Sequence, residues 1–269
     1  CARHLAKEET TTSMAAKAAR KALQKAGVDA SEVELVIVAT ITGDTDTPST
    51  ACKVQAQIGA DHAVAFDINA ACSGFLYGLH VADAFFKSGI YKNALVIGAE
   101  SLSKIVDWTD RGTCVLFGDG AGAAFLTASE EGGILSQSVG SNGEKWEVLS
   151  CPKGGYLQMN GQEVFKFAVR TVPLCVEDAL EKAGMKADDV DLFLLHQANV
   201  RILQSVAKRL KQPEEKFPMN MNECGNTSAA SLPILMAQLD EQGRFHRGNK
   251  VVLSGFGAGL TWGACVIEW

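Results

Sequence analysis

The sequence predicts an α/β protein built from two related halves. Apolar segments of strand length alternate with segments of helical periodicity along the 269 residues. The stretch ALQKAGVDASEVELVI at residues 22–37 returns as ALEKAGMKADDVDLFL at residues 179–194, an offset of 157 residues. FGDGAGAAFL at residues 117–126 is likewise echoed by FGAGLTWGA at residues 256–264. This repeat predicts a pseudo-two-fold molecule in which equivalent loops of the halves meet at a shared centre.

Composition is that of an ordinary globular protein and excludes several functions. Hydrophobic residues make up 47% and charged residues 21%, and the net charge of −6 argues against general nucleic-acid binding. No apolar run approaches the ~20 residues of a membrane helix, and no basic-then-apolar secretory leader is present. The eight cysteines show no Cys-x-x-Cys spacing, so zinc binding and a disulfide framework are poorly supported. We expect mostly buried free thiols in a reducing cytoplasm.

The sequence pattern of the first half predicts a series of helices and strands. Thr10 to Thr12 can cap a helix over residues 14–25, and Gly27 is a natural stop. A strand usually precedes such a helix, and the chain begins with Cys1 rather than Met, so we expect the natural protein to start earlier. The elements expected next are a strand at 33–41, a polar turn at 42–47, a helix at 49–58, a buried strand at 63–68, a strand at 94–99 and a strand–turn–strand unit at 113–127.

The second half follows an irregular connection. Residues 130–162 are rich in glycine, serine and polar residues, and a long helix at 162–182 follows, in which Pro173 predicts a kink. We expect the halves to form two domains, residues 1–160 and residues 161–269. The remaining elements are expected as a strand at 190–195, helices at 199–210 and 228–242, and two strands around a glycine turn at 250–269.

One cysteine lies where a strand ends and a helix begins. The segment FDINAACSGF at 66–75 places Cys72 between that strand and the helical spacing of Phe75, Leu79 and Phe86. Small neighbours leave room around its sulfur, and unpaired N–H groups at a helix N-terminus favour negative charge, which lowers the pKa of a thiol. Cys72 is therefore a candidate nucleophile. A small buried core residue explains its position alone equally well.

Two polar residues of the second half favour the catalytic interpretation. His196 closes the strand at 192–195, where open α/β sheets place ligands, and Asn226 lies in a small-residue loop that opens a helix. Adding the offset of 157 to Cys72 gives position 229, beside Asn226, so the equivalent loops should face one site. Each residue alone is more often structural; together they form a plausible nucleophile with two hydrogen-bond donors. The glycine pattern at 117–122 is similar to a phosphate-binding fingerprint, but it continues as strand and is better explained by close backbone packing.

These residues lie in motifs that resemble a known family. The resemblance is to β-ketoacyl-acyl carrier protein synthase III of the thiolase superfamily, and it rests on AACSGF at 70–75, HQAN at 196–199, GNTSAAS at 225–231, DRGT at 110–113, FGDGAGA at 117–123 and TWG at 261–263. These motifs extend along nearly the whole chain. The resemblance implies a thiolase-like fold of duplicated α/β halves, layered αβαβα, with mixed five-stranded sheets.

The resemblance also implies an acyltransferase that initiates fatty acid synthesis. Such an enzyme joins an acyl-CoA primer to malonyl-acyl carrier protein by decarboxylative condensation, without a cofactor or a metal. Cys72 would attack the primer thioester to form an acyl-enzyme, and the N–H groups of Cys72 and Ala258 would form the oxyanion hole. Neutral His196 and Asn226 would stabilise the enolate that decarboxylation leaves.

Substrate and partner contacts are implied in the same way. The substrate-binding set is Arg111, Phe117, Met159, Gly161, Asn199, Arg201 and Phe256. The set for the acidic carrier protein is Lys166, Arg201, Lys208 and Arg209, for which a plain solvated face is an equally good interpretation. We further expect a homodimer in the cytoplasm, with no nucleic-acid or membrane partner.

The chain departs from the family pattern at two places. The family's opening strand and the segment behind it, which supplies part of the nucleotide contact, are absent, so the adenine site is not assigned. Thr47 stands where relatives often carry an aromatic residue that floors the acyl pocket across the dimer. Because Thr47 leaves more space, we expect tolerance of primers longer than acetyl.

Other functions are less well supported. A degradative thiolase needs a second catalytic cysteine in the glycine turn at 255–259, which has none, and elongating synthases typically use two histidines where this chain pairs His196 with Asn226. A papain-like protease shares the residue types but not the duplicated architecture. A carrier-binding module without activity is disfavoured because the nucleophile and both donors are intact.

Overall fold

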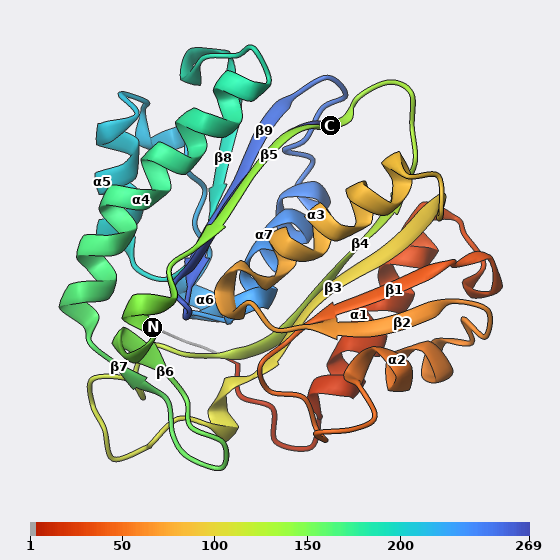
Figure 1. The fold of residues 1–269 in the computed structure, drawn as a ribbon, viewed down its shortest axis with the longest axis horizontal. Coiled ribbons are helices and arrows are strands. Elements are labelled where there is room, and N and C mark those ends of the chain that lie inside the picture. The colour runs from red at the N-terminus through yellow and green to blue at the C-terminus, as the bar shows by residue number, and fades with distance from the viewer. Residues whose placement is uncertain (1–3) are drawn as a thin grey trace.

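The first sheet is built from the first half of the chain. The computed structural model describes residues 4–269. The strands of the sheet are β1 (Leu35–Ala39), β2 (Val64–Ile68), β3 (Asn93–Ser101) and β4 (Asp119–Thr127), in the order β2-β1-β3-β4. Strand β1 pairs parallel with β2 and β3, and β3 pairs antiparallel with β4 (Figure 1). Parallel pairs need helical crossovers, so the helices must lie on the two faces of the sheet.

A second sheet follows the same plan. Its strands are β5 (Gly133–Ser141), β8 (Leu192–Leu195), β9 (Lys250–Gly257) and β10 (Thr261–Glu268), in the order β5-β10-β9-β8. Strand β8 pairs parallel with β9, and the other pairs are antiparallel. A small hairpin of β6 (Leu149–Ser150) and β7 (Gln158–Met159) lies apart from both sheets.

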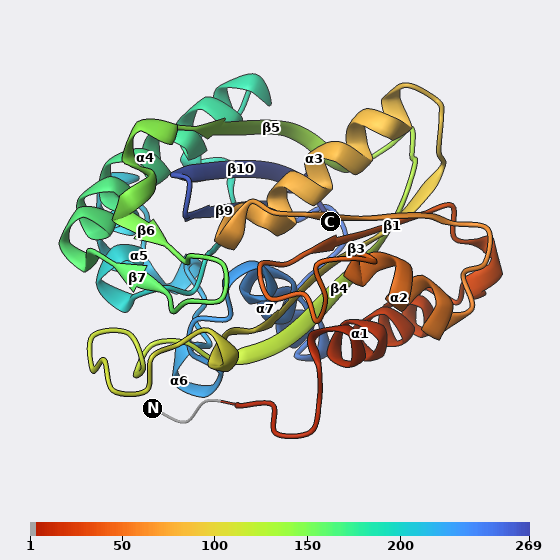
Figure 2. The same cartoon turned by 60° about the horizontal axis from the view of Figure 1, so that its bottom comes forward.

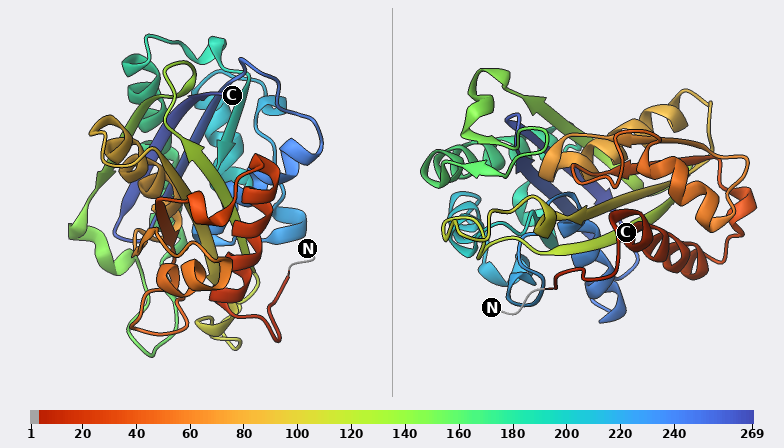
Figure 3. Two further views of the ribbon diagram at one scale, coloured as in Figure 1. Left: turned by 90° about the vertical axis from the view of Figure 1, so that its right-hand side faces the viewer. Right: turned by 90° about the horizontal axis from the view of Figure 1, so that it is seen from below.

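Helices separate and cover the two sheets. Between the sheets lie α3 (Gly74–Lys87) and α7 (Ser231–Glu241), which pack on strands of both. The outer face of the first sheet carries α1 (Thr11–Ala26) and α2 (Thr50–Ile58); α4 (Gly161–Lys182) covers the second sheet and packs against α5 (Val200–Arg209) (Figure 2; Figure 3). A short helix, α6 (Met221–Cys224), precedes α7. These five layers confirm the αβαβα fold.

Local chemistry explains why the outer helices form where they do. In α1 the Thr10 side chain accepts a hydrogen bond from the Ser13 N–H, and Gly27 ends the helix in the left-handed conformation at φ 67°. Ala15, Ala19 and the residues that share their face are buried on the sheet. Asn160 caps α4 and Asn199 caps α5 in the same manner, each through its side-chain oxygen.

The repeat of the sequence is a repeat of the structure. Strand β1 begins at Leu35 and β8 at Leu192, and β3 begins at Asn93 and β9 at Lys250, so both pairs are offset by 157 residues. The 3₁₀ turns η2 (Ala71–Ser73) and η7 (Ser228–Ala230) have the same offset. We use this offset below to compare equivalent positions.

Several expectations need correction. Each described sheet has four strands rather than five: in the second half, residues 217–220 run without strand pairing before α6, and in the first half no strand precedes α1 within residues 4–269. Residues 113–127 contain one strand rather than two: residues 113–118 belong to a loop, and β4 at 119–127 pairs along its whole length with β3. Strand β2 lies at a sheet edge and is only half-buried.

The connection expected to be irregular contains a strand. Strand β5 lies within residues 130–162 and pairs with β10, so the second sheet takes its edge strand from before residue 161. A division of the chain between residues 160 and 161 therefore cuts the connectivity of the second sheet. Within residues 4–269, no helix combines the length and the apolar character that a bilayer crossing requires.

Candidate active site

Cys72 lies in the turn η2, between the end of β2 and the start of α3. Its side chain is buried, and the preceding Ala71 adopts a left-handed conformation at φ 46°. A Cβ atom placed on Gly257 would come within 2.7 Å of the Cys72 nitrogen, so the end of β9 lies directly against the turn. A side chain at position 257 would push the two halves of the site apart, which explains why glycine is used there.

His196 follows β8 and is fixed on several sides. Its backbone N–H donates to the Ser254 carbonyl of β9 at 2.8 Å, and its ring Nδ1 lies 2.7 Å from the Ser231 hydroxyl at the start of α7. The ring of Phe256 packs edge-on against the imidazole at a centroid distance of 5.4 Å. Burial lowers the pKa of His196 to about 3, because a charged imidazolium would lose its hydration here. The imidazole is therefore neutral at physiological pH.

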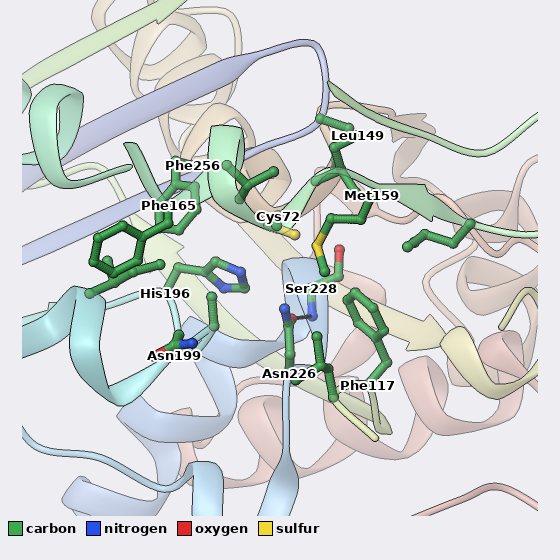
Figure 4. Close-up of a pocket in the computed structure, with 18 of the residues that line it drawn as sticks. Cys72, Phe117, Leu149, Met159, Phe165, His196, Asn199, Asn226, Ser228 and Phe256 are labelled. Atoms are coloured by element: carbon green, nitrogen blue, oxygen red, sulfur yellow. Dashed lines mark hydrogen bonds between the residues drawn. The ribbon is translucent and has the colours of Figure 1, made fainter. Parts of the chain in front are cut away.

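Asn226 enters the site from the loop before η7. Its side-chain oxygen accepts a hydrogen bond from the Ser228 N–H at 2.9 Å, which leaves the amide NH₂ to face the cavity (Figure 4). Its backbone N–H donates to the Leu116 carbonyl, and its carbonyl accepts from the Gly118 N–H, each at 2.9 Å. These two bonds tie the loop before β4 to the loop that carries Asn226, and so fix Phe117 beside it.

The three side chains converge on one cavity of about 380 Å³. Cys72, His196 and Asn226 line it together with apolar side chains such as Leu149 and Phe165 (Figure 4). The other residues expected at the site that line this cavity are Ala258, Phe117, Met159, Gly161, Asn199, Arg201 and Phe256. A mostly apolar cavity that also presents a thiol and two donors suits an acyl chain with a reactive head group.

Five expected binding residues do not line the cavity. Arg111 is exposed on the loop next to Gly112, which does line it. Thr47 is exposed before α2 on the side of the first sheet. The exposed basic side chains on α4 and α5 that also lie outside the cavity are Lys166, Lys208 and Arg209.

Burial controls the chemistry of the Cys72 thiol. The pKa of Cys72 is raised to about 12, chiefly by burial, while hydrogen bonding from Ser228 and from its own backbone lowers it and the charge of Glu100 raises it. This is opposite to the lowered pKa expected from the helix N-terminus. The reason is that Cys72 is buried in the turn before α3, and no described ion pair involves a residue of that turn to offset its desolvation. The free site therefore holds a neutral thiol.

Sequence reasoning missed a buried carboxyl group near the thiol. Glu100 on β3 is completely buried and accepts hydrogen bonds from the Thr42 hydroxyl at 2.6 Å, the Ile41 N–H at 3.1 Å and the Thr40 hydroxyl at 3.2 Å. Burial raises its pKa to about 7, although these bonds act to lower it. The available signal was an acidic residue at the end of an otherwise apolar strand, next to the strand that leads to Thr40.

Metal and disulfide chemistry find no support in the part of the chain that the structure describes. Within residues 4–269, no group of three or more His, Cys, Asp or Glu side chains could hold a metal ion. Seven cysteines are free thiols in this range, and Cys1 lies outside it. Cys52 and Cys151 are exposed, whereas Cys72, Cys175 and Cys265 are buried.

The layered duplicated fold, with cysteine, histidine and asparagine converging on one cavity, defines a thiolase-like condensing enzyme. Residues 66–143 match the family described as 3-oxoacyl-[acyl-carrier-protein (ACP)] synthase III, and residues 180–269 match the C-terminal part of the same family. The chain belongs to this family.

Individual relatives agree along almost the whole chain. A β-ketoacyl-[acyl-carrier-protein] synthase III of Clostridium novyi is 50% identical over 99% of this chain and 87% of its own length. The crystal structure of the synthase III of Aquifex aeolicus VF5 has a TM-score of 0.98 at 49% identity, covering 99% of this chain and 87% of that one. The priming β-ketosynthase of the R1128 polyketide pathway has a TM-score of 0.94 at 35% identity, covering 99% and 84%.

Proposed function

We propose that this chain condenses an acyl-CoA primer with malonyl-acyl carrier protein and so initiates fatty acid synthesis. The products are a 3-oxoacyl-acyl carrier protein, CoA and CO₂, and the intermediate is an acyl thioester on Cys72. The observation that carries the proposal is the convergence of Cys72, His196 and Asn226 on one mostly apolar cavity. The reaction needs no cofactor, because the thioester bond and the malonyl carboxylate supply its driving force.

In the first half-reaction the Cys72 sulfur attacks the primer carbonyl. The S–C bond to the enzyme forms, and the CoA thiolate leaves and takes a proton from solvent. The backbone N–H groups of Cys72 and Ala258 stabilise the negative oxygen of the tetrahedral intermediate. The contact between Gly257 and the Cys72 backbone supports this role, because it brings the two N–H groups to the same place.

In the second half-reaction the malonyl group loses CO₂ and leaves an enolate. Neutral His196 and the Asn226 NH₂ group donate hydrogen bonds to the enolate oxygen. Two contacts support these roles: Ser231 Oγ lies 2.7 Å from His196 Nδ1, and the Ser228 N–H holds the Asn226 oxygen away from the cavity. We assign the ring proton to Nε2, with the Ser231 hydroxyl donating to Nδ1, because this tautomer leaves an N–H free to donate to the enolate. One such donor is typically worth about 3–4 kcal/mol of transition-state stabilisation.

Condensation completes the cycle. The enolate carbon attacks the acyl-Cys72 carbonyl, the S–C bond to the enzyme breaks, and the Cys72 thiolate returns. The 3-oxoacyl product stays on the carrier protein. One proton is consumed per turnover, because the malonyl carboxylate leaves as neutral CO₂ while the CoA thiol and the Cys72 thiol are restored.

The substrate arms enter through the mouth of the cavity. Asn199 and Arg201 sit there at the start of α5, Gly161 at the start of α4, and Met159 in β7. We assign Asn199 and Arg201 to the pantetheine and nucleotide of both donors. Arg111 contacts the CoA from the neighbouring loop, and Phe117 and Phe256 contact the acyl chain inside.

The acidic carrier protein docks beside this mouth. Arg201 and Lys208 are exposed on α5, and their spacing of seven residues places them on the same face of the helix. Lys166 is exposed on the adjacent α4. Arg209 extends the same basic rim. Lys166 also pairs with Glu163 at 2.8 Å, so part of its charge is already compensated.

Two copies of the chain form the working unit, in the cytoplasm. The edge strand β2 is only half-buried, and Val64 on it is 47% exposed, so a partner strand has an open edge to pair with. Thr47, exposed before α2, would then reach the acyl pocket of the partner, and its small side chain would admit primers longer than acetyl. The free thiols favour a reducing compartment.

A panel of acyl-CoAs of increasing length tests the proposal. The protein is incubated with each, and the intact mass and the Cys72 peptide mass are measured, with Cys72→Ala as control. Acylation of Cys72 and its loss in Cys72→Ala are expected, with primers longer than acetyl accepted. His196→Ala and Asn226→Ala should acylate but decarboxylate malonyl-acyl carrier protein poorly. An unmodified Cys72 with every primer contradicts the proposal, and normal decarboxylation in both donor variants refutes the division of roles.

A further inference from the structure

The proposed function leaves one proton unplaced. Cys72 is a neutral thiol in the free site, and its proton must go to an acceptor as the sulfur attacks. His196 is a poor acceptor, because burial lowers its pKa to about 3. The acceptor must therefore be another group near the sulfur, and it must hold a proton near neutral pH.

Glu100 is the buried acid that meets both requirements. It is completely buried, its charge is felt at the Cys72 thiol, and its pKa lies at about 7. Among the residues that the structure describes, it takes part in no ion pair and is held by the neutral groups Thr40, Ile41 and Thr42. A buried carboxylate without a cation is costly, so its position near a nucleophile points to a use.

Ser228 is a neighbour that Glu100 and Cys72 share. Its hydroxyl lowers the pKa of both groups, so it is within reach of each. Its oxygen is nevertheless buried without a hydrogen bond of good geometry to any atom of residues 4–269. Ser228 and Cys72 line the same cavity (Figure 4). A hydroxyl of this kind is free to turn its proton toward either neighbour.

The internal repeat supports the same placement independently. Residue 100 is offset by 157 from Gly257, and Ala71 is offset by 157 from Ser228. A Cβ on Gly257 would lie 3.3 Å from the Ala71 side chain. By the pseudo-two-fold relation, the Glu100 side chain starts against Ser228.

Other charged groups near Glu100 already have partners. Asp44 accepts hydrogen bonds from the first turn of α1 and pairs with Lys104 at 3.3 Å. Asp119, at the start of β4, accepts from the Ser103 N–H at 2.8 Å and its hydroxyl at 2.6 Å. Cys72 is thus the titratable group to which Glu100 is linked.

We propose that the Ser228 hydroxyl and the Glu100 carboxyl form a proton path from Cys72, on which Glu100 holds the thiol proton while Cys72 carries the acyl group. This path rests on the proposed function. As the S–C bond forms, the S–H bond breaks and Ser228 accepts that proton while passing its own to the Glu100 carboxylate. When condensation breaks the S–C bond, the proton returns from Glu100 through Ser228 to the Cys72 thiolate. Glu100 touches no substrate atom and acts through Ser228.

Acylation kinetics of three variants test the path. The rate of Cys72 acylation by the preferred acyl-CoA is measured by quenched-flow mass spectrometry from pH 5.5 to 9, for the unsubstituted protein, Glu100→Gln, Ser228→Ala and the double variant. The unsubstituted rate should rise with a midpoint near pH 7, as Glu100 ionises. Both single variants should lose this midpoint and at least tenfold of the rate at pH 8, toward the ~10²-fold that a general base supplies. The double variant should be no slower than either, because both act in one path.

Two matched measurements separate the path from a structural role. Ala71 adopts the same left-handed conformation as Ser228, at φ 46° and 49°, so alanine is compatible with position 228. Ser101→Ala removes a buried hydroxyl next to Glu100 on the same strand and should acylate normally. Alkylation of Cys72 by iodoacetamide should be no slower in Glu100→Gln, because a negative charge beside the thiol is removed.

Four outcomes overturn the path, the last of them together with the proposed function. Glu100→Gln that keeps the midpoint near pH 7 would show that another group takes the proton. If both acylation and alkylation are faster in Glu100→Gln, Glu100 acts on Cys72 only through its negative charge and does not accept the proton. If the rate losses of the two single variants add in the double variant, Glu100 and Ser228 act independently and not in one path. An unsubstituted protein that no acyl-CoA acylates refutes the proposed function itself, and the path with it.

Discussion

The two turns η2 and η7 share a backbone conformation but carry different functional side chains. Ala71 and Ser228 open them at φ 46° and 49°, and each turn leads into one of the central helices. Asn69 and Asn226 are also related by the offset of 157, yet Asn69 is exposed and Asn226 is buried in the cavity. The first half places its functional group after the turn residue, at Cys72, and the second half places it before.

This difference teaches how a duplicated fold divides labour. The repeat supplies two sharp turns that meet at the pseudo-two-fold axis, and it fixes backbone positions to within a residue. Side chains at equivalent positions then differ, so one turn supplies the nucleophile and the other the donor. Position 100 is a buried glutamate, whereas the equivalent position 257 is glycine. The same contact between a strand end and a turn therefore places an acid near Ser228 in one case and lets the backbone approach Cys72 in the other.

Alanine substitutions of the two equivalent asparagines give the largest contrast. Asn226→Ala removes a donor to the enolate oxygen and should slow malonyl decarboxylation by about 10²–10³-fold. Asn69→Ala, at the equivalent position of the other half, should leave the rate unchanged because Asn69 does not line the cavity. Decarboxylation is measured as CO₂ release from malonyl-acyl carrier protein. Comparable losses in both variants would mean that the loops act through folding rather than through the cavity.

The glycines behind the turns give the next contrast, in stability. A Cβ at Gly98 would meet the Ala229 carbonyl oxygen at 2.2 Å, whereas a Cβ at the equivalent Gly255 would meet its neighbours at 3.3–3.6 Å. Gly98→Ala should therefore lower the free energy of unfolding by on the order of 3 kcal/mol, and Gly255→Ala by about 1 kcal/mol or less. Urea unfolding of the two variants measures the difference. Equal losses would indicate that η7 can move away from β3 at little cost.

Much of the fold was predictable because its signals are local. Caps such as Thr10 and Asn199, and glycine stops such as Gly27, mark helix ends within one turn of sequence. The pseudo-two-fold symmetry was predictable because residues 22–37 and 179–194 have similar sequences. Strand β5 was missed because GILSQSVGS is poor in bulky apolar residues, and its pairing with β10 is a tertiary contact.

The chemistry of the site was predictable only in part. Motif residues such as Cys72 and His196 could be named, but the pKa of the thiol could not, because burial comes from elements far apart in the chain. Glu100 was missed for the same reason: Thr42 lies 58 residues away from it, and Ser228 comes from the other half. A sequence pattern shows an acid in a strand, whereas only the fold shows that Glu100 has no ion pair with any of the residues 4–269.

Glu100 gives a contrast in pH dependence that its glycine counterpart lacks. Its pKa in the fold is raised from 4.5 to about 7, so the native state binds the proton more tightly than the unfolded chain does. The stability that this protonation contributes is fully present below about pH 4.5 and is lost as pH rises through 7. The free energy of unfolding of Glu100→Gln, relative to that of the unsubstituted protein, should therefore increase by on the order of 3 kcal/mol between pH 4.5 and 8. Urea midpoints at several pH values check this, and a pH-independent difference would mean that Glu100 is not the buried titrating group.

The smallest expected contrast is between the outer helices of the two halves. The repeat relates α1 to α4, and the substitutions compared lie on α1 and on α5, which packs against α4. Lys208→Glu on α5 reverses a charge of the proposed carrier face and should raise KM for the carrier protein by a few fold at low salt, with kcat unchanged. The increase should fade as ionic strength rises, because exposed charges are screened within about 10 Å at 0.1 M salt. Lys21→Glu on α1 changes the net charge equally but lies on the outer face of the first sheet, so its KM should not change. Equal effects of the two variants would mean that the carrier protein responds to total charge rather than to a face, and the docking surface would then have to be sought elsewhere.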